Sequence, residues 1–110
     1  MKIAILGGGN LGQSIAQGLL VNNYEANNIT ITRNRIELLG NLKDKGVHIC
    51  NDNLEAAKNA QLVIIAVKPY KITEILEEIN PVISKDKILV SVVSDFSIVK
   101  IEEVLSTIPS

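Results

Sequence analysis

The chain has 110 residues, of which 46% are hydrophobic and 21% charged, values that suit one compact domain with an aliphatic core. Lysine and arginine number 11 against 12 aspartates and glutamates, so no field of one sign attracts nucleic acid or an anionic membrane. Aromatic residues make up only 3%, which argues against the stacking surfaces of single-strand binders. We therefore expect a small-molecule ligand, with no nucleic acid and no membrane as partner.

The N-terminus and the single cysteine indicate the compartment. Residues 2–6 are too few for the apolar core of a signal peptide, and no stretch approaches the ~18 apolar residues of a membrane span, so we expect a cytoplasmic protein. Cys50 has no second cysteine with which to form a disulfide or a metal site, so no metal site is predicted. Free cysteine is usually buried, which predicts a buried, neutral thiol.

Five apolar runs predict β-strands. Ile3–Leu6 and Leu62–Val67 are continuously apolar, as expected for central parallel strands covered on both faces. Ile29–Thr32 and Val47–Cys50 alternate or are shorter, which places them nearer an edge of the sheet. Ile88–Val93 is long and rich in β-branched residues, which favours a fifth strand.

Between these runs, apolar residues recur at helical spacing. Such faces predict helices over residues 11–20, 36–42, 72–79 and 98–108. Asp52, with Glu55 three residues later, predicts the start of a further short helix. Gly46 is expected to end the helix that begins near residue 36. Because strands and helices alternate over short connections, the right-handed crossover rule predicts an α/β fold with a doubly wound, mainly parallel sheet.

Residues 7–12 have the sequence GGGNLG, which contains the pattern G-x-G-x-x-G directly after a predicted strand and at the start of a predicted helix. Gly7 permits a tight turn, Gly9 leaves the backbone open to a pyrophosphate, and Gly12 lets the helix lie close to the strands. The backbone N–H groups at the start of the helix are expected to point at the diphosphate. This context favours a dinucleotide site over a merely flexible turn.

The end of the second predicted strand indicates which dinucleotide is bound. NAD sites usually hold the ribose 2′-OH through an Asp or Glu about 20 residues after the glycines. The sequence there is Thr32-Arg33-Asn34-Arg35, without a carboxylate, and two guanidinium groups suit a 2′-phosphate. We therefore predict NADP(H) rather than NAD(H); the alternative is that Arg33 and Arg35 are solvated surface charges.

The fourth predicted strand ends in Ala66-Val67-Lys68-Pro69, at the carboxyl edge where open α/β sheets bind their ligands. Pro69 suits the first turn of a helix. The backbone of this loop is the favoured ligand contact, because a loop lysine such as Lys68 is usually solvated. The only histidine, His48, has no carboxylate partner or second ligand nearby in sequence, which favours an inert role. No catalytic residue is predicted.

Several stretches of the sequence together carry a family resemblance: MKIAILGGGNLGQSIAQGLL, ITRNR, NDNLEAA, AVKP and ILVSVVSDFSIVKIEEVL. They resemble the N-terminal, cofactor-binding domain of pyrroline-5-carboxylate reductases, and GGGNLG and AVKP in this order and spacing are the specific parts. The likeness runs along essentially the whole chain. It implies a Rossmann-like NADP-binding domain over residues 1–110, in a cytoplasmic oxidoreductase of amino-acid biosynthesis.

The resemblance also implies roles for individual residues. Leu6 to Gly12 wrap the diphosphate, and Arg33 to Arg35 occupy the position of the 2′-phosphate. Asn53, otherwise expected only to cap a helix, reaches the adenosine half, and Ala66 to Pro69 contact the ribose toward the nicotinamide. The predicted cofactor-binding residues are Leu6, Gly7, Gly8, Gly9, Asn10, Leu11, Gly12, Arg33, Asn34, Arg35, Asn53, Ala66, Val67, Lys68 and Pro69.

The activity implied by the resemblance is reduction of a cyclic imine by NADPH, that of pyrroline-5-carboxylate to proline. Family members have an Ala-Ala-Gly-like turn after the fifth strand, whereas this sequence has Val93-Ser94-Asp95-Phe96. Asp95 is expected near the nicotinamide, where its carboxylate would repel an anionic imine acid. The family's helical C-terminal domain, which carries substrate contacts and dimerisation, is not among these 110 residues. Alternatives are a free-standing NADP(H)-binding regulatory module and a coenzyme-F420-dependent NADP reductase.

Overall fold

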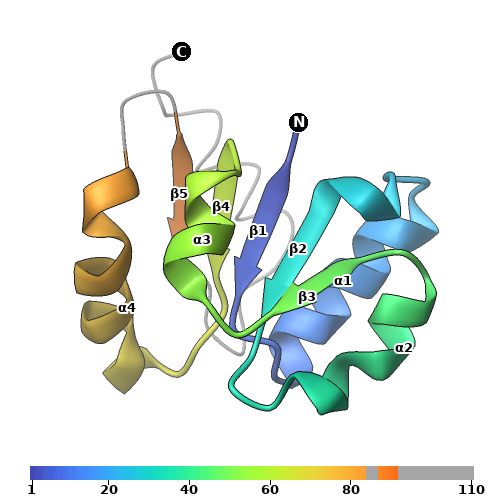
Figure 1. Ribbon diagram of the computed structural model, residues 1–110, viewed down its shortest axis with the longest axis horizontal. Coiled ribbons are helices and arrows are strands. Elements are labelled where there is room, and N and C mark those ends of the chain that lie inside the picture. Colours follow the sequence, from blue (N-terminus) through green and yellow to red (C-terminus); the bar gives the residue numbers. More distant parts are fainter. Residues whose placement is uncertain (84–86, 92–110) are drawn as a thin grey trace.

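A computed structural model describes residues 1–83 and 87–91 of the chain. The expectations for the strand end at residues 92–93, for Asp95 and for a helix over residues 98–108 therefore lie outside the described residues. Five parallel strands form one sheet (Figure 1): β1 (Ile3–Leu6), β2 (Ile29–Thr32), β3 (His48–Cys50), β4 (Leu62–Ile65) and β5 (Ile88–Ser91).

The order of the strands is β3-β2-β1-β4-β5, and all four pairings are parallel. The chain moves outward from the central β1 to β3 and then returns to place β4 on the other side of β1. This confirms the predicted doubly wound sheet, with β1 central and β3 at an edge. The point at which the order reverses lies between β1 and β4, where open sheets of this kind form a crevice.

Two predicted strands are longer than the observed ones. β4 ends at Ile65, paired with Leu6, because β1 has no paired residue beyond Leu6, and the next residue, Gly7, turns the chain with φ +115°. Ala66 and Val67 therefore belong to a loop. β3 begins after Val47, whose N–H donates to Leu42 O at 3.1 Å and so closes the end of the preceding helix.

The helices are α1 (Asn10–Val21), α2 (Gly40–Asp44), α3 (Asn53–Lys58) and α4 (Ile72–Ile79), with 3₁₀ turns at Ala26–Asn28, Ile36–Leu39, Pro69–Lys71 and Asn80–Val82. The helix predicted over residues 36–42 is only partly correct, because a 3₁₀ turn occupies its first half and α2 starts at Gly40, a poor helix former. The predicted starts and ends are confirmed elsewhere. Asp52 Oδ1 accepts the N–H of Glu55 at 3.2 Å, and Gly46 ends α2 with φ +98°.

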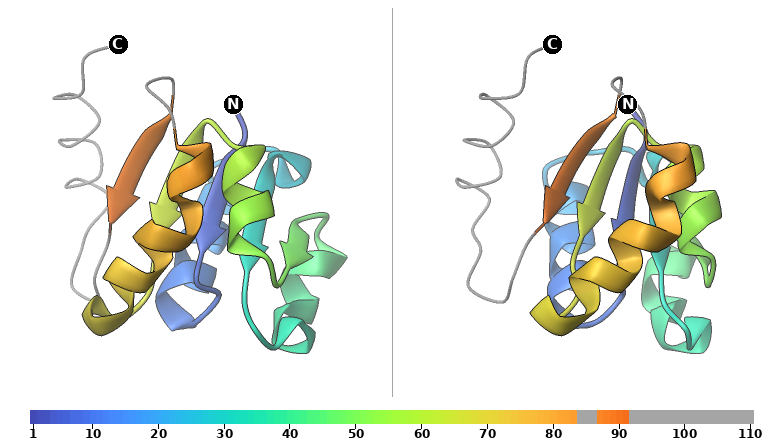
Figure 2. Two further views of the ribbon diagram at one scale, coloured as in Figure 1. Left: turned by 60° about the vertical axis from the view of Figure 1, so that its left-hand side comes forward. Right: turned by 90° about the vertical axis from the view of Figure 1, so that its left-hand side faces the viewer.

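The helices cover both faces of the sheet (Figure 2). On one face Ile15 and Ala16 of α1 and Leu42 of α2 pack against alternate strand residues such as Ile5 and Ile31. On the other, α3 and α4 pack against the opposite set, which includes Leu6, Val63 and Ile65. Every residue of β1 and β4 is buried, which is why their sequences are apolar without alternation.

Cys50 is only half-buried, so the predicted buried thiol is wrong. Because Cys50 lies on the edge strand β3, it has a neighbouring strand on one side only. Its Sγ lies 3.6 Å from the backbone oxygen of Asp52, at the start of α3. No helix within the described ranges combines the length and the apolar character needed to cross a membrane.

Candidate dinucleotide-binding site

Residues 7–12, here called the glycine loop, leave β1 at the carboxyl edge of the sheet, where the strand arrows end in Figure 1. The segment that follows β4 lies beside this loop, since Ala66 N–H donates to Leu6 O at 2.8 Å. Two cavities flank the loop. The first, of about 510 Å³, is lined by Gly9, Asn10, Leu11, Ala66, Val67, Lys68 and Tyr70.

The second cavity, of about 340 Å³, extends from the glycine loop to the ends of β2 and β3 and to α4. It is called the β2-side cavity below. Its lining residues are Gly7, Gly8, Gly9, Thr32, Arg33, Asn34, Asn51, Asn53, Ala66, Val67, Lys68, Tyr70, Lys71, Glu74, Ile75 and Glu78. The two cavities share Gly9, Ala66 to Lys68 and Tyr70, so they are continuous enough for one elongated ligand to occupy both across the crevice.

The three glycines of the G-x-G-x-x-G pattern have different surroundings. At Gly7, a Cβ would lie 2.5 Å from the backbone oxygen of Ala66, and the φ of +115° also favours glycine. At Gly12, a Cβ would lie 1.9 Å from the backbone oxygen of Gly7 and 3.3 Å from Ile5 Cγ2 of β1, which confirms the predicted close approach of the helix to the strands. At Gly9, a Cβ would meet nothing within 4 Å among the described residues. Gly9 therefore leaves open the space that a pyrophosphate requires.

Side chains from two elements hold the glycine loop in place. The carbonyl oxygen of Gly8 accepts hydrogen bonds from Gln13 Nε2 of α1 at 2.7 Å and from Arg33 Nη1, which follows β2, at 2.8 Å. A Cβ on Gly8 would also lie 2.8 Å from Leu39 Cδ2. The loop is therefore fixed before any ligand binds, which lowers the entropy cost of binding.

The N-terminus of α1 points toward the shared part of the two cavities. The helix starts at Asn10, and its N-cap is Gly9, whose backbone is extended. Because glycine has no side chain, the N-cap does not occupy the N–H groups of the first turn. The N–H groups of Asn10 and Leu11 have no intrahelical acceptor, and the first turn contains no acidic residue. These groups and the helix dipole make the position favourable for an anion.

The predicted phosphate-binding arginines differ in position. Arg33 and Asn34 line the β2-side cavity. The Arg35 side chain is 72% exposed, and its Nε lies 3.1 Å from Glu37 Oε1. An exposed ion pair of this kind contributes only about 0–1 kcal/mol, so Glu37 holds Arg35 weakly. The structure thus groups Arg33 and Asn34 with the glycine loop, and a role for Arg35 stays a prediction.

Most of the predicted residues line one or both cavities. Four of them are not among the described lining residues of either cavity: Leu6, Gly12, Arg35 and Pro69. The Leu6 side chain is fully buried in the core. Any contact of Leu6 with a ligand would therefore come from its backbone. Pro69 begins the 3₁₀ turn between Lys68 and Tyr70, both of which line the two cavities.

Sequence reasoning missed Thr32 and one side of α4. Thr32 is 2% exposed, and its Oγ1 accepts the N–H of Gly7 at 3.3 Å and donates to Asn53 Oδ1. Asn51, which follows β3, was missed as well. On α4 and the turn before it, the missed residues are Tyr70, Lys71, Glu74, Ile75 and Glu78. Their spacing of three and four residues places them on one side of a helix, which is the only signal in the sequence that connects them.

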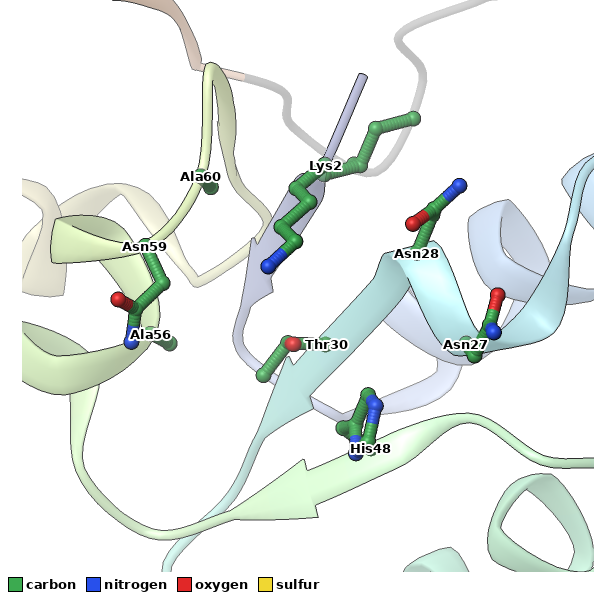
Figure 3. Close-up of a pocket in the computed structure, with 9 residues that line it drawn as sticks. Lys2, Asn27, Asn28, Thr30, His48, Ala56, Asn59 and Ala60 are labelled. Atoms are coloured by element: carbon green, nitrogen blue, oxygen red, sulfur yellow. The ribbon is translucent and has the colours of Figure 1, made fainter.

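A separate cavity of about 220 Å³ lies at the amino ends of the strands, opposite the glycine loop (Figure 3). Lys2, Thr30, His48 and Asn59 surround it, and Thr30 and His48 are partners in the pairing of β2 with β3. His48 therefore lies at the amino end of the short strand β3 and is not among the described residues that line the two cavities beside the glycine loop. Its inert role stays a prediction.

Comparison with known proteins agrees with this geometry. The sequence model of the family described as "NADP oxidoreductase coenzyme F420-dependent" matches residues 2–95. Pyrroline-5-carboxylate reductase 2 of Dictyostelium discoideum is 44% identical over 99 residues, which are 88% of this chain and 33% of that protein. A pyrroline-5-carboxylate reductase structure from Coxiella burnetii has a TM-score of 0.78 and 33% identity, and the match covers 96% of this chain and 40% of that one.

The pyrroline carboxylate reductase of Plasmodium falciparum, solved with NADP bound, has a TM-score of 0.72 and 25% identity, over 94% of this chain and 37% of that one. The chain thus spans between 33% and 40% of the length of these three relatives. Its parallel sheet flanked by helices is the Rossmann-like fold of their N-terminal part. The chain therefore belongs to the family described as coenzyme F420-dependent NADP oxidoreductases, and it corresponds to the N-terminal domain of the pyrroline-5-carboxylate reductases.

Proposed function

We propose that this chain binds NADP(H) as the cofactor domain of an enzyme that reduces a cyclic imine, pyrroline-5-carboxylate to proline, in the cytoplasm. One observation carries the proposal: Gly9 leaves open space at the N-terminus of α1, and Arg33 lines the same cavity. The names of the relatives support the substrate, and the NADP found in the Plasmodium falciparum structure supports the cofactor.

Each part of the site has a role in this proposal. The N–H groups of Asn10 and Leu11 hold the diphosphate, and Arg33 pairs with the 2′-phosphate. Lys68 lines both cavities and offsets some of the negative charge of the cofactor. When bound, the cofactor supplies the hydride, so the task of this domain is to position the dinucleotide and to neutralise its charge.

NADPH is expected to bind at least about tenfold more tightly than NADH, because a charge-assisted fork to the extra phosphate needs to supply only ~1.4 kcal/mol. Replacing Arg33 and Arg35 together with alanine should abolish the preference. Arg33→Ala alone should account for most of the loss, because Arg33 lines the β2-side cavity, whereas Arg35 is exposed and is not among the described residues that line either cavity. Calorimetric titration of each variant with both cofactors measures these ratios.

Affinity for NADH serves as the internal control in this series. It should change by no more than about threefold in Arg33→Ala, because Gln13 still holds the Gly8 carbonyl after one hydrogen bond is lost. Equal affinities of the wild-type chain for NADPH and NADH would discard the 2′-phosphate role. A larger effect of Arg35→Ala than of Arg33→Ala would assign the phosphate to the other arginine.

The family description also names coenzyme F420, which gives a second candidate activity, NADP reduction by reduced F420. Enzyme assays of a protein that contains this domain together with a substrate domain, with pyrroline-5-carboxylate and NADPH and separately with reduced F420 and NADP, distinguish the two. We expect these 110 residues alone to bind NADPH without oxidising it, because closing a substrate pocket over the nicotinamide requires further protein. Turnover of pyrroline-5-carboxylate by this chain alone would contradict that expectation. Reduction of NADP by reduced F420, without turnover of pyrroline-5-carboxylate, would show that the proposed imine substrate is wrong.

A further inference from the structure

We infer that Asn53 and Glu78 make this site selective for adenine by recognising its 6-amino group. The inference rests on the proposed function and adds to it a specificity for the base. It depends on three hydrogen bonds that connect the glycine loop to α4 and that fix the orientation of one carboxamide.

Along this series of hydrogen bonds, from Gly7 to Glu78, each residue donates to the next. The N–H of Gly7 donates to Thr32 Oγ1 at 3.3 Å, and the hydroxyl of Thr32 donates its single hydrogen to Asn53 Oδ1. With its oxygen occupied by Thr32, Asn53 turns its Nδ2 toward Glu78, whose Oε2 lies 3.5 Å away. Thr32 is 2% exposed, so water does not compete for these bonds at its end. Asn53 therefore presents an N–H donor, and Glu78 a carboxylate acceptor, side by side.

The position of the adenine base follows from the positions of the phosphates and the ribose. In doubly wound sheets the pyrophosphate lies at the N-terminus of the first helix, and the ribose 2′ position lies at the end of the second strand. Here these positions are the glycine loop and Arg33. The base is attached to the same ribose, so it occupies the rest of the β2-side cavity, where Ile75 supplies an apolar wall and Asn53 and Glu78 a polar one.

The two polar groups match one edge of adenine. Adenine presents an amino donor next to a ring-nitrogen acceptor, a pattern that a paired acceptor and donor on a protein recognise. The Glu78 carboxylate accepts from the amino group, and the second N–H of Asn53 donates to the ring nitrogen. Hypoxanthine has a carbonyl in place of the amino group, so it would place an acceptor against the carboxylate.

Comparison of NADPH with its hypoxanthine analogue, reduced nicotinamide hypoxanthine dinucleotide phosphate, tests the inference. We expect the wild-type chain to bind NADPH at least about tenfold more tightly than the analogue, a difference of ~1.4 kcal/mol. In Glu78→Gln the ratio of the two affinities should fall to about one. The glutamine carboxamide can accept from the amino group of adenine and can equally donate to the carbonyl of hypoxanthine. NADPH should still bind to this variant.

Glu77→Gln is the matched control, because it removes the same charge from the neighbouring residue of α4. Glu77 lies on an exposed surface with Thr73, Leu76 and Asn80, away from the β2-side cavity. The ratio in this variant should remain that of the wild-type chain. Equal binding of the two cofactors by the wild-type chain would overturn the inference, as would an equal effect of Glu77→Gln and Glu78→Gln. Absence of NADPH binding would instead remove the proposed function itself.

Discussion

Gly9→Val is expected to reduce NADPH affinity by at least about 100-fold, or ~2.7 kcal/mol, in a chain that still folds. The backbone at Gly9 is extended, with φ −77° and ψ −165°, a conformation that valine adopts readily. A Cβ there meets no described heavy atom within 4 Å, so the side chain displaces no part of the described core. It would occupy the place where the pyrophosphate approaches the N-terminus of α1. Calorimetric titration and a thermal melt measure affinity and folding.

Gly18→Val provides the matched control for this experiment. Gly18 is also in α1, is exposed, and within the described chain has no heavy atom within 4 Å of its Cβ position. The same substitution there should leave NADPH affinity unchanged, because Gly18 lies about two helical turns after Asn10, the first residue of α1, and lines neither of the described cavities. A folded Gly9→Val variant with wild-type affinity would contradict the proposed binding mode.

Gly12→Ala is expected to lower the free energy of unfolding by about 3 kcal/mol or more, a large share of the 5–15 kcal/mol of an ordinary domain. A Cβ at Gly12 would lie 1.9 Å from the oxygen and 3.0 Å from the carbonyl carbon of Gly7. These are backbone atoms of a turn whose positive φ is already restricted, so relief requires α1 to move away from β1. Urea denaturation measures the loss.

Gly18→Ala is the corresponding control for stability. Because Gly18 lies on an exposed part of α1 with open space around it, alanine should stabilise the chain by about 0.5–1 kcal/mol through its higher helix propensity. The two alanine variants should therefore change stability in opposite directions. A Gly12→Ala variant as stable as the wild-type chain would show that α1 and the glycine loop are packed less closely than described.

The sequence predicted the fold well wherever a local signal was strong. Continuous apolar runs identified β1 and β4 as central, and the Asp52–Glu55 spacing located the start of α3. The errors arose where tertiary structure decided the outcome. Strand β4 stops at Ile65 because its partner strand turns at Gly7, and Cys50 is half-buried because β3 lies at an edge. Neither fact is visible in the local sequence.

The candidate site was predictable to a similar extent. The glycine pattern indicated a dinucleotide loop, and the end of the second strand indicated Arg33 and Asn34. The sequence did not indicate Glu78, because α4 reaches the β2-side cavity only after the chain has crossed to the other face of the sheet. The apolar residues of α4 show which side faces the core, but they do not show which polar neighbours border a cavity.

The most direct test of the proposed binding mode is a titration followed by backbone amide chemical shifts. On addition of NADPH, the largest changes of backbone amide shift should occur at residues 8–11 and at Arg33 and Asn34, which surround the expected phosphate positions. Residues around Thr30 and His48, in the cavity at the opposite edge, should change little. Saturable changes centred on Thr30 and His48, with residues 8–11 unaffected, would contradict the account.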